Sequence, residues 1–97
     1  MNLVFKALAD PTRRQVLQLL KDGPMKAGEI ADHVSVAKPT LSDHLALLRQ
    51  AELVSSEKNG TSITYWINAS VLESALLSFA EMVDIPLSRT SPRRLAR

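Results

Sequence analysis

Apolar residues recur every three or four positions in five segments of the chain, a spacing that predicts amphipathic helices. These segments cover residues 2–9, 11–22 and 26–33, a stretch beginning near 37–39, and 71–84. Between the last two, short runs of β-branched and aromatic residues at 53–57 and 62–67 flank Lys58-Asn59-Gly60-Thr61. Asn-Gly between two such runs is a strong hairpin signal. The pattern therefore predicts a mainly α fold with four helices, a small β-hairpin and a fifth helix in chain order.

Residues that start and stop helices mark the boundaries of these segments. Asp10 followed by Pro11 is a typical helix start, because the carboxylate accepts from free backbone N–H groups and proline suits the first helical position. Gly23-Pro24 ends that helix, and Asn68 is placed to cap the last one. The first segment is too short to be stable alone in water, so we expect it to pack against the rest of the domain.

The helix that begins near residues 37–39 carries its leucines on one face. Leu41, Leu45 and Leu48 are spaced to form a buried stripe, which leaves small polar residues on the opposite face. A short helix precedes it across a tight turn, and a hairpin with a basic, glycine-containing tip follows it. This arrangement predicts a winged helix-turn-helix. Such a helix fits the major groove of DNA, and a wing tip reaches the flanking backbone or minor groove.

We expect the DNA interface on the outer face of that helix, on the wing tip and near the start of the second helix. The expected contacts are Lys38, Thr40, Ser42, Asp43, His44, Arg14, Lys58, Asn59, Gly60 and Thr61. Thr40 and Ser42 are suited to base edges, whereas Lys38 and Lys58 are suited to phosphates. Asp43 is favourable near DNA only if it accepts from cytosine N4 or orients a neighbour, because phosphates repel a carboxylate.

Charged side chains near this region have two interpretations each. His44 lies at the edge of the buried stripe, so a hydrogen-bonded packing histidine is as good an interpretation as a DNA contact. Of Arg13 and Arg14, we expect one to pair internally with an acid such as Glu29 or Asp32 and the other to face DNA or solvent.

The net charge is only +2, from 12 basic and 10 acidic residues in a chain of 97, and this value alone does not indicate a nucleic-acid partner. Its distribution is uneven, since the last nine residues carry four arginines and no acid, whereas residues 68–88 carry three acids and no base. We therefore expect a winged helix-turn-helix and dimerisation domain over residues 1–86 and a flexible basic tail over 87–97. A chain of this length supports one modest core.

The composition excludes several classes of function. The chain has no cysteine, so disulfides, thiolate nucleophiles and Cys-based zinc sites are absent. With two histidines and no glycine-rich phosphate loop, we expect neither an enzyme nor a bound cofactor. No apolar stretch is long enough to cross a membrane and no signal peptide is evident, so the cytoplasm is the expected location.

The order and spacing of these motifs resemble one bacterial family. DPTRRQVLQLL, AGEIADHV, VAKPTLSDHLALLRQAELV and ITYWIN together look like the ArsR/SmtB family of repressors, over nearly the whole chain up to about Asp84. VFKALADPTRRQVLQLL and KPTLSDHL are most similar to its SdpR-like autorepressor branch. Lys26 and Ala37 stand where the family often has Ser or Thr caps, and each loss weakens a cap by about 1 kcal/mol.

The resemblance implies a homodimer, joined through the first and last helices, that represses transcription by occupying an operator in double-stranded DNA. Those helices carry apolar residues that a monomer would leave exposed. The expected dimer residues are Leu3, Val4, Leu72, Leu76, Phe79 and Val83. A two-fold dimer also presents two recognition helices about 34 Å apart to an inverted repeat.

Metal sensing, for which the family is known, is not expected here. The family's metal sites use cysteines in the helix that reads KAGEIADHV, or histidine with acids in the last helix, and this chain has no histidine after His44. Glu73, Glu81 and Asp84 alone would bind transition metals weakly. The SdpR-like resemblance suggests control by a membrane-bound protein that sequesters the repressor, or simple autoregulation. The alternative function is a winged-helix module that binds protein rather than DNA, which the near-neutral charge favours.

Overall fold

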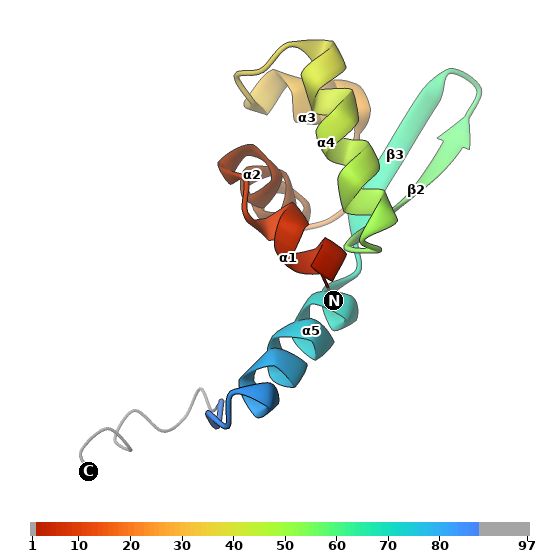
Figure 1. The fold of residues 1–97 in the computed structure, drawn as a ribbon. Coiled ribbons are helices and arrows are strands. Elements are labelled where there is room, and N and C mark those ends of the chain that lie inside the picture. Colours follow the sequence, from red (N-terminus) through yellow and green to blue (C-terminus); the bar gives the residue numbers. More distant parts are fainter. Residues whose placement is uncertain (1, 88–97) are drawn as a thin grey trace.

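The computed structural model describes residues 2–87, which form five helices and three strands (Figure 1). The helices are α1 (Asn2–Leu8), α2 (Pro11–Leu20), α3 (Ala27–His33), α4 (Lys38–Gln50) and α5 (Ala69–Met82). The strands are β1 (Met25–Lys26), β2 (Val54–Asn59) and β3 (Ser62–Ile67). The predicted fold class, a mainly helical winged helix-turn-helix, is confirmed. The expected basic tail lies outside the described residues except for Leu87.

The sheet has one strand more than the predicted hairpin. β1 pairs antiparallel with β3 through Met25 opposite Tyr65 and Lys26 opposite Thr64, so the strand order is β1-β3-β2. A two-residue strand has no alternating pattern to detect, and its pairing partner lies about forty residues further along the chain. The extra strand places the N-terminus of α3 directly beside the wing.

The predicted hairpin is confirmed, with a tighter turn than the four polar residues suggested. β2 and β3 pair from Val54 opposite Ile67 to Asn59 opposite Ser62, which leaves only Gly60 and Thr61 between the strands. Gly60 has φ +63° and Thr61 does not have a positive φ, a combination typical of a type II′ turn. Lys58 and Asn59 therefore belong to β2.

The predicted start of α2 is confirmed, whereas Asn68 stands at the predicted N-cap position of α5 but makes no side-chain cap bond. Asp10 Oδ2 accepts from the backbone N–H groups of Thr12 at 2.8 Å and Arg13 at 3.1 Å, with Pro11 as the first helical residue. Asn68 makes no such cap to α5. Its side-chain amide instead donates to the carbonyl of Glu52 at 2.9 Å, because the end of α4 lies within its reach.

One core joins the helices and the sheet. The buried stripe of α4 is as predicted: Leu41, Leu45 and Leu48 are all at most 4% exposed. They pack in one cluster with residues of α1, α2, α3 and both long strands. The largest fully buried side chains of the described chain are Leu20, Ile30, Leu48, Leu53, Val16 and Val54. This packing fixes which face of α4 is left for solvent.

Helix α5 projects from the rest of the domain (Figure 1). Its only buried side chains are Ala75 and Ala80, and large apolar residues remain exposed along it. These exposed residues are Leu76, Leu77, Phe79, Met82 and Val83. Among residues 2–87, every helix is too short or too polar to span a lipid bilayer.

Two of the residues expected at a dimer interface have other surroundings. Val4 is only 6% exposed and belongs to the core of its own chain, so it offers little surface to a partner. Leu72 is half-buried against the same core. Both lie where α1 and the start of α5 approach the domain body. The surface that remains available for a partner is formed by Leu3, Leu76, Phe79 and Val83 together with neighbouring apolar residues of α5.

Candidate nucleic-acid interface

The outer face of α4 carries several of the residues that we expect to contact DNA. Lys38, Thr40, Ser42 and Asp43 are all exposed, on the side opposite the leucine stripe. Their exposure follows from the helical period, because burying Leu41 and Leu45 turns the intervening residues towards solvent. The helix begins after Ala37 without a side-chain cap, as the sequence implied.

The wing tip is exposed beside this helix. Lys58 and Asn59 at the end of β2 and Gly60 and Thr61 in the turn are all solvent-accessible. Figure 1 shows the β2–β3 hairpin projecting from the domain on the side of α4. The described residues therefore bring two separately predicted groups, one helical and one in the hairpin, onto a shared surface.

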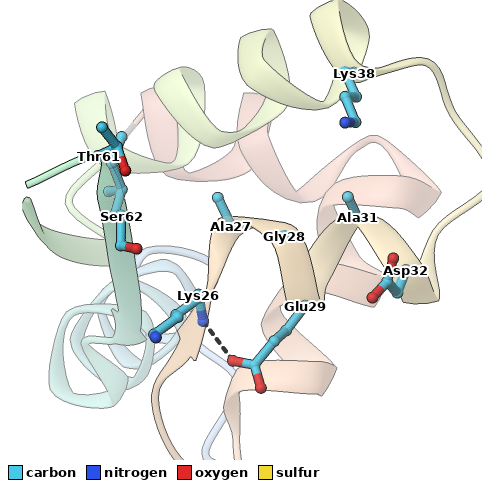
Figure 2. Close-up of a pocket in the computed structure, with 10 residues that line it drawn as sticks. Lys26, Ala27, Gly28, Glu29, Ala31, Asp32, Lys38, Thr61 and Ser62 are labelled. Atoms are coloured by element: carbon cyan, nitrogen blue, oxygen red, sulfur yellow. Dashed lines mark hydrogen bonds between the residues drawn. The ribbon is translucent and has the colours of Figure 1, made fainter.

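A groove of about 510 Å³ separates α3 from the wing (Figure 2). The expected contacts Lys38 and Thr61 both line it, from α4 and from the wing respectively. Lys26 and Ser62 also line it and were not among the expected DNA contacts. Their position depends on the pairing of β1 with β3, which no short-range pattern predicts.

A smaller pocket of about 300 Å³ continues the groove towards the core. It shares Lys38 and Ile63 with the groove and adds Ser42 and Leu45 of α4 and Tyr65 of β3. Most of the residues that line it are apolar. The groove and the pocket together give α4 and the wing a concave junction.

The electrostatics of the groove are mixed. Lys26 and Lys38 line it, but so do Glu29 and Asp32 of α3. The Glu29 carboxylate is engaged locally, since its Oε1 accepts from the backbone N–H of Lys26 at 2.8 Å, as the dashed line in Figure 2 shows. In this bond the third helical residue of α3 accepts from the N–H of the N-cap residue, as in one half of a capping box. The groove therefore carries lysines and carboxylates together, with Lys26 at the wing end and Lys38 near Asp32 (Figure 2).

The His44 side chain makes contacts within the chain and is largely covered by it. Its side chain is only 14% exposed, its Nδ1 lies 3.0 Å from Arg13 Nη1, and its Nε2 lies 3.8 Å from Asp10 Oδ2. These contacts support the packing interpretation of His44. Desolvation raises the pKa of Asp10, but the hydrogen bonds from the backbone N–H groups of Arg13 and Thr12, together with the neighbouring His44 and Arg13 side chains, outweigh it and lower the pKa below 3.8.

The expected pairing of Arg13 or Arg14 with an acid of α3 is wrong. Arg13 donates to the carbonyls of Ala7 at 2.8 Å and Lys6 at 3.0 Å, and Arg14 donates to the carbonyl of Leu8 at 2.8 Å. Both guanidinium groups thus bind the free carbonyl groups at the C-terminus of α1, where the helix dipole favours cations. Arg14 is exposed while making this bond.

Within residues 2–87, no three His, Asp or Glu side chains gather into a group that could hold a metal ion. The acids of α5 are exposed along the projecting helix.

A helix-turn-helix with a polar, exposed second helix beside an exposed wing defines a winged-helix regulator of transcription that binds DNA. The chain belongs to the ArsR family of bacterial regulatory proteins. The family profile described as "Bacterial regulatory protein, arsR family" matches residues 10–56, from the cap of α2 into β2. The family expected from the sequence is thereby confirmed.

Relatives of known name match more of the chain. The transcriptional repressor SdpR of Bacillus subtilis (strain 168) is 50% identical over 76 residues, which are 78% of this chain and 84% of SdpR. An arsenical resistance operon repressor of Staphylococcus xylosus is 36% identical over 73 residues, 75% of this chain and 70% of that protein.

Solved structures share the fold. An ArsR family transcriptional regulator has a TM-score of 0.78 at 32% identity, covering 86% of this chain and 91% of its own. An ArsR-like transcriptional regulator from Rhodococcus sp. RHA1 has a TM-score of 0.77 at 28% identity, covering 98% of this chain and 83% of its own. The similarity therefore extends beyond the helix-turn-helix.

Proposed function

We propose that this protein is a homodimeric repressor that binds an inverted-repeat operator, with α4 in the major groove and the wing on the flanking DNA. The observation that carries the proposal is the shared surface formed by the polar face of α4 and the wing tip around one groove. Similarity to the transcriptional repressor SdpR supports repression as the outcome of binding. The cytoplasm, where bacterial DNA lies, is the proposed location.

The roles of the residues follow from their chemistry. Thr40 and Ser42 carry hydroxyl groups that donate to or accept from base edges, whereas Lys38 and Lys58 attract phosphates. Asn59, Gly60 and Thr61 form a narrow tip that approaches the backbone or minor groove closely. His44 and Arg14, which were first expected to contact DNA, are engaged within the chain and take no direct part in this proposal.

The exposed apolar surface of α5 supports the dimer. Leu76, Phe79 and Val83 are each at least 41% exposed, a large apolar area for a single small domain. A second copy would cover this surface. A two-fold axis through it would present two α4 helices to two half-sites separated by one helical turn of DNA.

The proposal is tested by measuring the binding of the chain to fragments of its own promoter region over a range of salt concentrations. We expect specific binding whose log affinity falls linearly with log salt, because each phosphate contact releases counterions. Absence of binding at low salt, together with capture of a protein partner that survives nuclease treatment, would instead favour the protein-binding alternative.

A further inference from the structure

We propose that Arg13 is a positioning residue for DNA binding. Through His44 it joins α1 to the N-terminal half of α4, which carries the proposed base contacts Thr40 and Ser42. The proposal rests on the proposed function of α4 as the recognition helix. It goes beyond that function by assigning an effect on DNA affinity to a partly buried contact within the chain.

The contact between Arg13 and His44 is directional. Arg13 Nη1 lies 3.0 Å from His44 Nδ1, and a guanidinium can only donate, so His44 Nδ1 must accept. The proton of a neutral His44 ring then resides on Nε2, which faces Asp10 Oδ2 at 3.8 Å. His44 is held between a donor on one side and a carboxylate on the other.

Arg13 is itself anchored to α1. Its Nε donates to the carbonyl of Ala7 at 2.8 Å and its Nη2 to the carbonyl of Lys6 at 3.0 Å. One planar side chain thus joins the end of α1 to α4 through three contacts in a fixed geometry. A lysine at this position has the charge but not the fork, and cannot make all three contacts at once.

Helix α1, to which Arg13 is bound, is held in place by contacts with the core and with α5. Val4 and Ala7 are buried in the core, and the ring of Phe5 lies 5.2 Å from that of Phe79 in α5, at an interplanar angle of 59°. A helix of seven residues has little stability by itself, so its position is set by these tertiary contacts.

The Arg13 contact adds to the packing of the N-terminal half of α4. The C-terminal end of the helix is held by Leu48, which is fully buried and whose carbonyl accepts from the N–H of Leu53 at 3.0 Å. The N-terminal half is packed through Leu41, which is 4% exposed, but the helix begins after Ala37 with no side-chain cap. His44 lies within two turns of Thr40, so the Arg13 contact restrains the half of α4 that carries the proposed base contacts.

The test compares operator affinity among folded dimers of four variants: Arg13→Lys, His44→Leu, His44→Gln and the double variant Arg13→Lys/His44→Leu. Affinity is measured by fluorescence anisotropy at a temperature where thermal melts show every variant to be folded, with dimerisation checked by sedimentation. We expect Arg13→Lys and His44→Leu each to lose about tenfold in affinity and the double variant to lose no more than either alone. His44→Gln retains a side-chain acceptor for Arg13 and should recover most of the loss.

The matched control is Gln15→Ala. Gln15 also lies on α2 and also donates to a carbonyl at a helix end, but that carbonyl belongs to His33 of α3, at 2.9 Å, and not to α1. We expect it to lower the melting temperature while changing affinity less than twofold. Additive losses in the double variant, or no recovery in His44→Gln, would overturn the proposal. Failure of the unmodified protein to bind would instead overturn the proposed function.

Discussion

Glu52 has a backbone conformation that glycine usually provides. Its φ is +62°, and it follows α4 as the left-handed residue of a Schellman motif. In that motif the N–H of Glu52 donates to the carbonyl of Arg49 at 2.9 Å and the N–H of Leu53 to that of Leu48 at 3.0 Å. A side chain with a Cβ is strained in this region, so the structure identifies a site where the chain is less stable than it could be.

Glu52→Gly should therefore raise the free energy of unfolding by about 1 kcal/mol, because the strain is removed while both backbone bonds are kept. Urea unfolding followed by circular dichroism measures the change. Ala46→Gly, at an exposed position inside α4, is the control and should cost about 1 kcal/mol. A loss of stability in Glu52→Gly would show that the Schellman geometry is not strained.

Asp10 links stability to pH. Its pKa is lowered in the folded chain below the ordinary value of 3.8, so the ionised carboxylate contributes stability that is present above that value. The contribution is lost as the pH falls through the lowered pKa. Asp10→Asn keeps an effective helix cap but does not titrate.

We expect Asp10→Asn to lose less stability than the unmodified chain when the pH is lowered from about 5 to 2, as followed by thermal melts across that range. Asp10→Ala, which removes the cap as well, should be less stable by about 1 kcal/mol at neutral pH. Identical acid dependence in Asp10→Asn and the unmodified chain would rule out this role for Asp10.

At the scale of elements, we propose that α4 and the wing make different kinds of contact with DNA from one shared surface. α4 presents short hydroxyl side chains that suit base edges, and the wing presents Lys58 near the end of β2, beside the tight turn of Gly60 and Thr61. Base contacts change sequence preference, whereas phosphate contacts change affinity for all sequences.

Replacing Thr40 or Ser42 by Ala should relax base preference at one position of each half-site, at a cost of about 1 to 3 kcal/mol for the preferred base. Lys58→Ala should weaken binding to all sequences similarly and reduce the salt slope by about 1. Binding selections from a randomised operator library, with salt titrations on the best site, measure both effects. A change of base preference in Lys58→Ala would contradict this division of tasks.

At the scale of the whole molecule, α5 carries more apolar surface than its own domain covers. Leu76 is 41% exposed and lies on the surface that we propose is covered by a second copy, whereas Ala75 beside it is buried against the core. A charge at Leu76 should therefore disturb association without disturbing the fold of one chain.

We expect Leu76→Glu to shift the protein from dimer to monomer in sedimentation experiments, with helical content unchanged, and to reduce operator affinity because only one half-site is then engaged at a time. Ser70→Glu adds the same charge to the exposed first turn of α5 and serves as the control. A dimer that persists in Leu76→Glu would place the interface on another surface.

The local sequence was sufficient for elements whose signals lie within a few residues. Asp10-Pro11 predicted the start of α2, the leucine stripe predicted the buried face of α4, and Asn59-Gly60 predicted the hairpin. These signals depend on helical period, capping and turn geometry, which neighbouring residues decide among themselves. The family resemblance followed from their order.

Contacts between distant segments could not be predicted in this way. Arg13 binds carbonyl groups of α1 rather than an acid, and a backbone acceptor has no distinctive side chain in the sequence. Asn68 binds the end of α4 rather than capping α5. Val4 is buried in the core of its own chain, where α1 packs onto the domain body.

The sequence by itself determined the helices, the hairpin, the polar face of α4 and the family, because periodicity and caps act over a few residues. Only the tertiary structure decided that β1 pairs with β3 and brings Lys26 beside the wing, and that His44 lies between Arg13 and Asp10. Those outcomes depend on which segments meet across the core. Many segments compete for the same apolar surface, and the choice among them is made by the packing of the whole chain.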